Sequence, residues 1–306
     1  MKKVIILLST YNGQNYIEKQ IESLLKQTYN NIEIFIRDDG SKDNTITILK
    51  KYEKKYNYIN VEYGNNIGFY KSFLWLLNNA PKADYYSFCD QDDVWKNDKI
   101  QKAVTKLNKY DNKKPNLYFT DYEICDSNLT FISYSKKYGN PYSLERALLA
   151  VQIPLGFNTV INYTLKNHID NYFKSNYKIW GHDYWCYLIA LCFGNVIYDE
   201  GYYSTKYRRH DANVSTYSKG FLKKQILRIK NFIFGNGQNI INDTVNLFYD
   251  VYKNDLSQKN REIIIIYKNK KFNIINRIKK LIHLKRYSDS LFDEFAIRVM
   301  LFLGKI

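Results

Sequence analysis

The chain has 306 residues, 45% of them hydrophobic and 17% aromatic, which excludes an intrinsically disordered protein and suits one large domain or two smaller ones. The formal net charge at pH 7 is +16, and the segment from Lys219 to the end holds 18 Lys/Arg against 7 Asp/Glu. A basic excess of this size suits nucleic acid, an anionic membrane surface or an anionic substrate, and by itself it does not select one of them.

The amino-terminal stretch MKKVIILLSTYNG contains an apolar run that is too short for the core of a secretory signal peptide. No stretch reaches the ~20 apolar residues needed to cross a bilayer. The four cysteines form no CxxC pair and have apolar or aromatic neighbours, so we predict buried free thiols in a reducing compartment. We therefore expect a cytoplasmic protein, with peripheral contact at the inner face of the plasma membrane left open.

Apolar runs and helical patterns alternate from the amino end. Residues 4–9 form a continuous apolar run, typical of a strand that is covered on both faces of a parallel sheet. Residues 15–28 place apolar side chains at helical spacing, and IEIFIRD at 32–38 predicts a second strand. Residues 45–56 predict a second helix, with Asp43 in position to cap it.

The same alternation continues to residue 121. The predicted segments are a strand at 59–63, a helix at 68–78, a strand at 84–90, a helix at 96–110 and a strand at 116–121. Repeated strand–helix units imply an α/β fold with a mostly parallel central sheet flanked by helices. Polar clusters (STYNG, RDDGS and DQDD) follow three of the strands, and the carboxyl ends of parallel strands share one edge, where ligands bind.

Beyond residue 121 the pattern is less regular. Residues 122–218 mix short helices and strands, and helical patterns follow from residue 219, as in GFLKKQILRIKNFIF (220–234) and NIINRIKKLIHL (273–284). A helix over 220–234 would carry an apolar stripe among lysines. It would either lie on an anionic membrane or pack on the rest of the chain, and both alternatives stay open. Nucleic-acid binding is disfavoured, because no recognised nucleic-acid module accompanies the charge.

The strand at 84–90 ends in SFCDQDDVW, where Asp90, Asp92 and Asp93 stand within four positions. Carboxylates this close repel one another unless a cation holds them, and oxygen ligands suit Mg²⁺ or Mn²⁺ bound together with substrate phosphates. The alternative is a helix start, in which Asp92 or Asp93 caps a helix that begins near Trp95.

Two more acids follow the second strand in RDDGS. Asp38 or Asp39 is placed to accept hydrogen bonds from a nucleobase or a ribose. The alternative is a polar turn in which Gly40 takes a positive φ.

Six motifs occur in an order and at distances that resemble one known family. They are STYNG (9–13), IRDDGSKDNT (36–45), NNIGFYKS (65–72), FCDQDDVW (88–95), GHDYW (181–185) and YRRHDANVS (207–215). Together they resemble the family-2 glycosyltransferases of the GT-A fold, in particular bacterial rhamnosyltransferases and related capsule or O-antigen enzymes. The resemblance implies a GT-A catalytic domain at 1–218, with a nucleotide-sugar half at about 1–121 and an acceptor half at about 122–218. Residues 219–306 would be a basic, mainly helical C-terminal region.

The resemblance also implies a nucleotide-sugar site along the edge where the strands end. The residues that would bind the donor are Thr10, Tyr11, Asn12, Asp38, Asp39, Asn66, Gly68, Lys71, Asp90 and Arg208. Asp38 or Asp39 would bind the base, and Asp90 would approach the ribose. A Mn²⁺ or Mg²⁺ ion on the diphosphate would be ligated by Asp92, with His210 completing the metal site or touching the diphosphate.

Asp183 in GHDYW matches the catalytic base of the family, although many relatives carry Glu-Asp where this chain has His182-Asp183. As the base, Asp183 would take the proton from an acceptor hydroxyl, whose oxygen attacks the anomeric carbon and inverts its configuration in a single displacement. The alternative is that Asp183 only caps the helical segment YWCYLIAL that follows it.

The resemblance therefore implies an inverting, metal-dependent glycosyltransferase that adds a sugar to a glycan or lipid-linked glycan of a bacterial surface polysaccharide. Rhamnose from dTDP-rhamnose is the first expectation for the donor, resting on GHDYW and YRRH, and a UDP-hexose is the second. Two alternatives belong to other classes. They are a non-catalytic binding module of the same fold, against which the intact motifs argue, and a phosphodiesterase or nucleotidyltransferase metal site.

Overall fold

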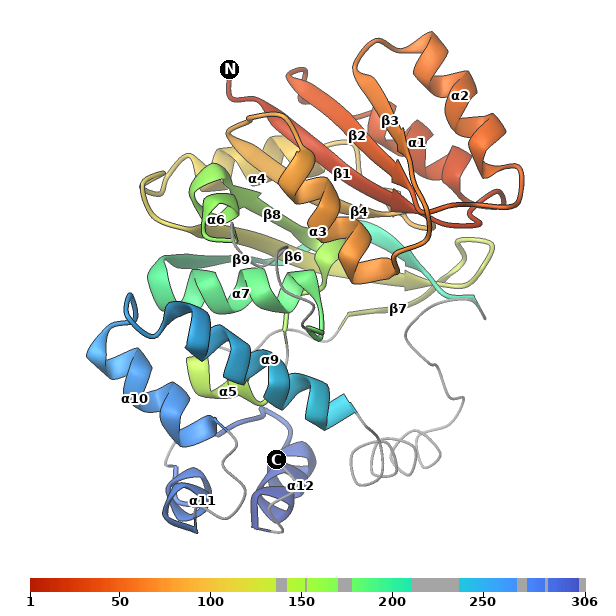
Figure 1. Ribbon diagram of the computed structural model, residues 1–306. Helices are drawn as coiled ribbons and strands as arrows, with labels where there is room; N and C mark the ends of the chain where they lie inside the picture. Colours follow the sequence, from red (N-terminus) through yellow and green to blue (C-terminus); the bar gives the residue numbers. More distant parts are fainter. Residues whose placement is uncertain are drawn as a thin grey trace. The chain divides into compact units, whose positions relative to one another are not determined.

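The computed structural model describes residues 1–135, 142–151, 153–169, 178–210, 237–268, 274–283 and 286–302. The chain forms two compact units (Figure 1). The first comprises Met1–Lys137, Pro154–Ser175 and Phe193–His210, and the second comprises Tyr138–Ile153, Asn176–Cys192 and Asp211–Ile306.

The first unit is built on a sheet that has nine strands within the described residues, in the order β3-β2-β1-β4-β8-β6-β9-β5, with β7 paired to β6. The strands are β1 (Val4–Thr10), β2 (Ile32–Asp38), β3 (Ile59–Tyr63), β4 (Tyr85–Asp90), β5 (Val94–Trp95), β6 (Asn116–Cys125), β7 (Phe131–Tyr134), β8 (Thr159–Asn162) and β9 (Asn195–Arg208). The first four are mutually parallel, and β6 and β9 are parallel to each other. The carboxyl ends of β1, β2 and β4 therefore meet at one edge of the sheet, as their polar endings predicted.

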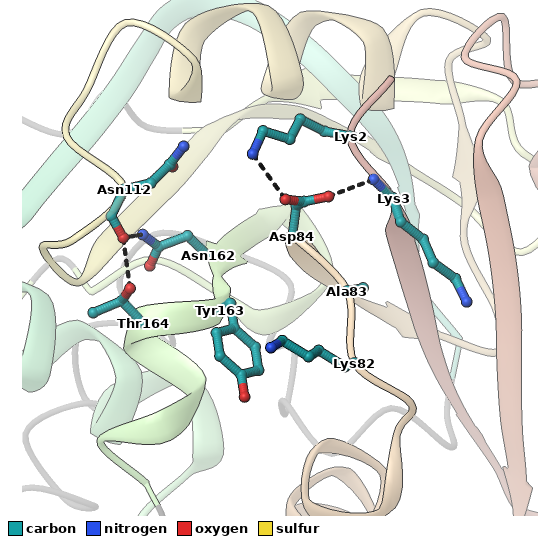
Figure 2. A pocket seen from close by; sticks show the side chains of 9 residues that line it. All are labelled: Lys2, Lys3, Lys82, Ala83, Asp84, Asn112, Asn162, Tyr163 and Thr164. Carbon is teal, nitrogen blue, oxygen red and sulfur yellow. Dashed lines mark hydrogen bonds and ion pairs between the residues drawn. The ribbon is translucent and has the colours of Figure 1, made fainter.

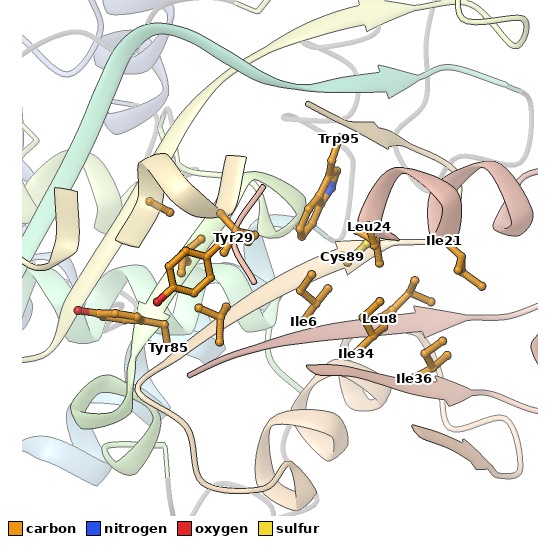
Figure 3. Close-up of a cluster of buried hydrophobic side chains, with 14 of the residues drawn as sticks. Ile6, Leu8, Ile21, Leu24, Tyr29, Ile34, Ile36, Tyr85, Cys89 and Trp95 are labelled. Carbon is orange, nitrogen blue, oxygen red and sulfur yellow. The ribbon is translucent and has the colours of Figure 1, made fainter. Parts of the chain in front are cut away.

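Helices cover both faces of this sheet. They are α1 (Ile17–Leu25), α2 (Thr45–Lys55), α3 (Phe69–Asn79), α4 (Lys99–Leu107) and α6 (Tyr163–Asn167), with a 3₁₀ turn at Gly156–Asn158. Side chains alternate along a strand, so Ile6 and Leu8 of β1 point into a buried cluster that they share with Ile21 and Leu24 of α1 (Figure 3). The opposite face of β1 and β2 is covered by α3. The strands and helices predicted up to residue 90 are confirmed, with small shifts at their ends.

The segment after the acidic cluster differs from the prediction. Val94–Trp95 forms strand β5, which pairs antiparallel with β9, and helix α4 begins only at Lys99. Asp93 is fully buried and accepts a hydrogen bond from the backbone N–H of Arg208 in β9, at 3.0 Å. The prediction that Asp92 or Asp93 caps a helix starting near Trp95 is therefore wrong, because Val94 and Trp95 form a strand with β9 instead of the first turn of a helix.

The cap predicted for α2 is displaced by one residue. The helix is preceded by Asn44, whose side chain makes no capping bond. The carboxylate of Asp43 instead accepts from the backbone N–H of Thr45, at 3.0 Å, and from the Thr45 hydroxyl, at 2.5 Å. Asp43 thus binds the first helical N–H group from one position further upstream than expected.

The described part of the second unit is helical. Its elements are α5 (Leu144–Leu148), α7 (His182–Phe193, whose last residue belongs to the first unit), α9 (Gly237–Tyr252), α10 (Gln258–Tyr267), α11 (Ile274–Leu281) and α12 (Leu291–Phe302). Trp185 of α7 packs edge-on against Phe248 of α9, and both side chains are fully buried. The helical C-terminal region is thereby confirmed, whereas the predicted helix at 220–234 lies outside the described residues.

Across the described ranges, no helix combines the length and the apolar character needed to cross a bilayer. The four cysteines are free, and three of them are buried, as expected from their apolar surroundings.

Candidate functional site

The loop after β1 is fastened to the loop after β4 by one side chain, Gln91. Its amide oxygen accepts from the Thr10 hydroxyl, at 2.6 Å, and from the backbone N–H of Tyr11, at 2.9 Å. Its amide nitrogen donates back to the Tyr11 carbonyl, at 3.1 Å. A Cβ at position 13 would collide with the Gln91 amide oxygen, so Gly13 leaves the space that this contact needs.

The loop after β1 is also fastened to the loop after β2. Asn12 has a positive φ of 48°, which asparagine tolerates better than most residues. Its backbone N–H donates to the Ser41 hydroxyl and its side-chain oxygen accepts from the Lys42 N–H, both at 2.8 Å. Of the three predicted nucleotide-pocket residues, Thr10 is buried and Tyr11 and Asn12 are exposed.

The two acids after β2 are buried and bound within the chain. Asp38 accepts from the N–H groups of Gly40 and Ser41, at 3.1 and 2.9 Å, and from the Ser41 hydroxyl, at 2.5 Å. Asp39 forms an ion pair with Arg37 and accepts from the N–H groups at positions 67 and 68, both at 2.9 Å. Gly40 has a φ of +84°, so the polar turn kept open for RDDGS is present.

Arg37 is a residue that the sequence analysis missed. Its guanidinium group is buried, pairs with Asp39, and donates to the Asn65 carbonyl at 2.9 Å and to the Ser72 hydroxyl at 3.2 Å. It also lies over the Trp75 ring, 5.4 Å from its centroid. The available signal was an arginine that follows the apolar run Ile34–Ile36 of β2 and stands just before two acids. Through Arg37 the end of β2 is joined to the loop before α3 and to α3 itself.

The residues around the start of α3 that were predicted to bind the sugar donor include and flank the segment held by Asp39. Gly68 precedes α3 with a φ of +91°, and a Cβ there would meet nothing, so glycine is needed for its backbone conformation rather than for space. Asn66 and Lys71 are exposed on either side of Gly68.

The acidic cluster at the end of β4 brings Asp90, Asp92 and Asp93 together, with one carboxylate oxygen of each within 4.8 Å of the others. Asp92 also contacts His210, whose Nε2 lies 2.8 Å from a carboxylate oxygen. The His210 ring stacks on Tyr16, with centroids 4.5 Å apart. The structure thus unites both predicted metal ligands.

The Arg208 side chain holds the backbone of the acidic cluster through hydrogen bonds. Its side chain is buried and donates to the backbone carbonyls of Asp92, at 2.7 Å, and Ser127, at 2.6 Å. Its guanidinium group lies over the Tyr16 ring, 4.8 Å from the centroid. Arg208 therefore fixes the backbone that carries Asp92 and Asp93.

Electrostatics make the cluster a candidate for a cation. Burial and the neighbouring Asp92 and Asp90 raise the pKa of the Asp93 carboxyl well above its ordinary value. Lys99 attracts these acids from the interior, but burial lowers the pKa of its own ammonium group to about 7. One oxygen of Asp93 is buried without a hydrogen-bond partner among the described residues. An oxygen-rich set with an unsatisfied carboxylate atom fits Mg²⁺ or Mn²⁺.

Asp183 belongs to the second unit, in the first turn of α7. It is partly buried, and one carboxylate oxygen accepts from the backbone N–H of Tyr184, at 2.8 Å. A Cβ on Gly181 would collide with that oxygen, so the glycine leaves room for it. Burial lowers the pKa of the neighbouring His182 to about 4, so this imidazole is neutral at neutral pH.

A hollow of about 300 Å³ lies at the opposite ends of β1 and β4, among Lys2, Lys3, Lys82 and Asp84 (Figure 2). Its charges are largely compensated within the chain. The Lys2 ammonium pairs with Asp84 at 2.9 Å, and Lys82 lies 5.0 Å from the centroid of a tyrosine ring. Ligands of parallel sheets bind at the carboxyl ends of the strands, so this hollow is set apart from the candidate site.

Comparisons with known proteins identify the family. Residues 5–149 match the family Glycosyl transferase family 2. An uncharacterized glycosyltransferase of Rickettsia typhi is 30% identical over 309 aligned positions, which cover 91% of this chain and 94% of that protein. The chain belongs to glycosyltransferase family 2. This glycosyltransferase is also 28% identical to the Escherichia coli UDP-Glc:alpha-D-GlcNAc-diphosphoundecaprenol beta-1,3-glucosyltransferase WfgD, over 72% of the chain and 83% of that enzyme.

A shorter match is to the dTDP-rhamnosyl transferase RfbG of Shigella flexneri, 39% identical over 105 residues, which cover 33% of this chain and only 36% of that protein. Among solved structures, S. aureus TarS (residues 1–349) in complex with UDP superposes with a TM-score of 0.55 at 17% identity, covering 99% of this chain and 81% of that one. The Pyrobaculum calidifontis mannosyltransferase PcManGT gives a TM-score of 0.50 at 12% identity, over 99% and 82% of the two chains. These likenesses confirm the GT-A fold.

The buried ion pair between Arg37 and Asp39 generates a prediction about stability. Replacing Arg37 by Met leaves a buried carboxylate without its counter-charge, which we expect to lower the free energy of unfolding by about 3–5 kcal/mol. The matched control is Lys51→Met, which removes an ion pair with Glu18 whose side chains are 66% and 46% exposed, and should cost no more than about 1 kcal/mol. Urea unfolding followed by circular dichroism measures both. Equal losses in the two variants would contradict the assigned role of Arg37.

Proposed function

We propose that this family-2 glycosyltransferase is an inverting, metal-dependent enzyme that uses a nucleotide-diphosphate sugar as its donor. The observation that carries the proposal is the meeting of Asp90, Asp92 and Asp93 at the end of β4, where one buried oxygen of Asp93 has no hydrogen bond to any residue that the structure describes. The loop that holds Thr10 and Tyr11 is tied to the same place through Gln91. A cation and a nucleotide can thus be held side by side at this edge.

In this proposal the donor lies along the edge formed by the ends of β1, β2 and β4. The exposed Tyr11 ring offers a face for the base, and Asp38 or Asp39 would bind the base from the loop after β2, where both carboxylates also accept from backbone N–H groups. Asp90 approaches the ribose, and Asn66, Gly68 and Lys71 lie near the donor on the segment that Asp39 holds in place. Arg208 contributes positive charge from behind the acidic cluster.

Asp92 and His210 would hold a Mn²⁺ or Mg²⁺ ion, with Asp93 as the buried supporting acid. The ion would neutralise the charge that develops on the diphosphate as it leaves. A His–carboxylate contact of 2.8 Å orients both side chains before any ion binds.

Asp183 is the proposed base. It accepts the proton of the acceptor hydroxyl while the acceptor oxygen forms its bond to the anomeric carbon and the bond from that carbon to the diphosphate oxygen breaks. The nucleoside diphosphate leaves with the electron pair, and the anomeric configuration inverts in this single displacement. We assign the catalytic domain to residues 1–218 and a basic helical region to 219–306.

The proposed acceptor is a glycan or lipid-linked glycan of a bacterial surface polysaccharide. Support comes from the relatives WfgD, whose name gives a diphosphoundecaprenol-linked GlcNAc as acceptor, and RfbG, whose name gives dTDP-rhamnose chemistry. The two names also support different donors. Rhamnose from dTDP-rhamnose is the first proposal, supported by the higher identity to RfbG, and a UDP-hexose is the second, supported by the wider alignment with WfgD.

The donor proposal predicts that the purified protein releases a nucleoside diphosphate from one donor of a panel that includes dTDP-rhamnose and UDP-hexoses. Release should require Mn²⁺ or Mg²⁺ and stop on chelation with EDTA, because the leaving group then lacks charge neutralisation. Mass spectrometry of the products separates transfer of a sugar from transfer of a nucleotide. A sugar-transfer reaction that proceeds unchanged in EDTA would remove the metal from the mechanism.

The metal assignment predicts that Asp92→Asn weakens Mn²⁺ binding by at least about tenfold, because the variant loses an anionic ligand at the ion. Titration calorimetry without any donor measures this directly. Asp111→Asn, at an exposed acid outside the cluster, serves as the matched control and should bind Mn²⁺ like the unaltered protein. Unchanged affinity in the Asp92 variant would overturn the assignment.

The two roles considered for Asp183 predict different outcomes for Asp183→Asn. Asparagine can still accept from the Tyr184 N–H, so a residue that only caps the helix would be replaced with little loss. A base cannot be replaced in this way, and we expect kcat to fall by roughly 10²–10⁴-fold while the donor dissociation constant stays unchanged. Single-turnover kinetics and donor titration separate these quantities, and near-normal turnover would leave Asp183 as a cap.

A further inference from the structure

Helix α11 turns its apolar side to solvent. Ile274, Ile278 and Ile282 follow one another at intervals of four residues, and together with Ile275 they are between 50% and 68% exposed. On the inward side of the same helix Lys280 is only 8% exposed. This is the reverse of the usual arrangement of a surface helix, in which the apolar stripe faces the core and charged residues face water.

Helix α12 also exposes large apolar side chains, although its inward side is apolar as well, with Ile297, Met300 and Leu301 buried. Its exposed side carries Leu291, Phe292, Phe295, Val299 and Phe302, which are between 38% and 69% exposed. Its inward side includes Glu294, which is buried. Helices α11 and α12 are neighbours (Figure 1). Both present large apolar side chains to water, and we call these side chains the α11–α12 apolar surface.

Polar bonds hold the two helices in this orientation. Glu294 accepts from the backbone N–H groups of Tyr287 and Ser288, at 2.6 and 2.9 Å. Arg298 pairs with Glu294 at 2.7 Å and donates to the carbonyls of Leu281 and His283 at the end of α11. Neither helix can roll its apolar side inward without breaking these buried bonds.

The same part of the chain is strongly basic. Residues 268–286 contain eight Lys/Arg and no Asp/Glu. They are Lys268, Lys270, Lys271, Arg277, Lys279, Lys280, Lys285 and Arg286. Among the described residues of this segment, Lys279 and Arg286 are exposed and Arg277 is half-buried, whereas Lys280 is buried on the inward side of α11. A surface that combines apolar side chains with a cluster of basic residues is complementary to an anionic bilayer, which offers both acyl chains and negative headgroups.

We infer that the α11–α12 apolar surface docks onto an anionic lipid bilayer. With 8 and 12 residues, the two helices are far shorter than the ~20 residues needed to span a membrane, so they would lie in the interface. A second copy of the chain fits less well, because a twofold contact places the same patch on both sides and would bring two basic segments together. The inference goes beyond the proposed reaction and does not depend on it.

The test is co-sedimentation of the full chain with vesicles, without donor or acceptor. The protein should bind vesicles of phosphatidylcholine mixed with phosphatidylglycerol and bind those of phosphatidylcholine alone far more weakly. Added salt should weaken binding, because it screens the attraction to the headgroups. Since no turnover is measured, failure of the proposed reaction and failure of this inference remain distinguishable.

Paired variants locate the surface. Ile278→Ser with Phe295→Ser removes two exposed apolar side chains and should weaken vesicle binding on the order of tenfold or more. The matched control is Phe131→Ser with Ile132→Ser, which changes side chains of similar exposure in the first unit and should leave binding unchanged. For the charges, Lys279→Glu should weaken binding to anionic vesicles, whereas the exposed Lys54→Glu should not.

Several outcomes would overturn the inference. Equal binding to neutral and anionic vesicles would contradict the role of the basic residues. Equal effects of the two double variants would contradict the role of the α11–α12 apolar surface. Light scattering after gel filtration tests whether a second copy of the chain binds the surface instead of a bilayer. A dimer that the Ile278/Phe295 variant dissociates, with vesicle binding unaffected, would assign the surface to a second copy.

Discussion

Repulsion among the three carboxylates at the end of β4 is the constraint around which the candidate site is arranged. At about 4.8 Å, two such charges repel by on the order of 3 kcal/mol even at an effective dielectric constant of about 20. Two contacts of Arg208 hold the cluster: its backbone N–H donates to the Asp93 carboxylate, and its guanidinium group donates to the Asp92 backbone carbonyl. The buried Lys99 acts on Asp93 only through its charge, since its ammonium group donates to the Phe157 carbonyl. These contacts fix the backbone of the cluster but leave its carboxyl groups crowded, and a bound cation would favour their ionised forms.

Acids at the same edge of the sheet fall into two kinds. Asp38 and Asp39 are satisfied within the chain, by a tight turn in one case and by Arg37 with two backbone N–H groups in the other. Asp93 keeps one buried oxygen without a hydrogen bond to any described residue. A buried polar atom without a hydrogen bond is costly. Asp38 and Asp39 therefore hold the loops in place, and the cluster around Asp93 marks where a ligand can bind.

Much of this architecture was predictable from local patterns in the sequence. Continuous apolar runs located the buried parallel strands, and the parallel arrangement alone placed their polar endings on one edge. The predictions failed where the local structure depends on residues that are far away in the sequence. Strand β5 exists because Val94 and Trp95 pair with residues more than 100 positions away in β9, which no local pattern contains. Likewise, the importance of Arg37 depends on acceptors at Asn65 and Ser72, which only the folded chain brings to it.

The exposed apolar sides of α11 and α12 are explained by what their opposite sides bind. Burying one phenylalanine side chain such as Phe295 would gain about 1.5–3 kcal/mol. Rolling α12 to achieve this would free the buried N–H groups of Tyr287 and Ser288 from Glu294, at about 1–3 kcal/mol for each group left unsatisfied. It would also remove Arg298 from the carbonyls that close α11. Rolling α12 would in addition expose Ile297 and Leu301, which are now buried. The present orientation therefore keeps both the polar bonds and this buried apolar contact, and it leaves the opposite apolar side chains facing outward.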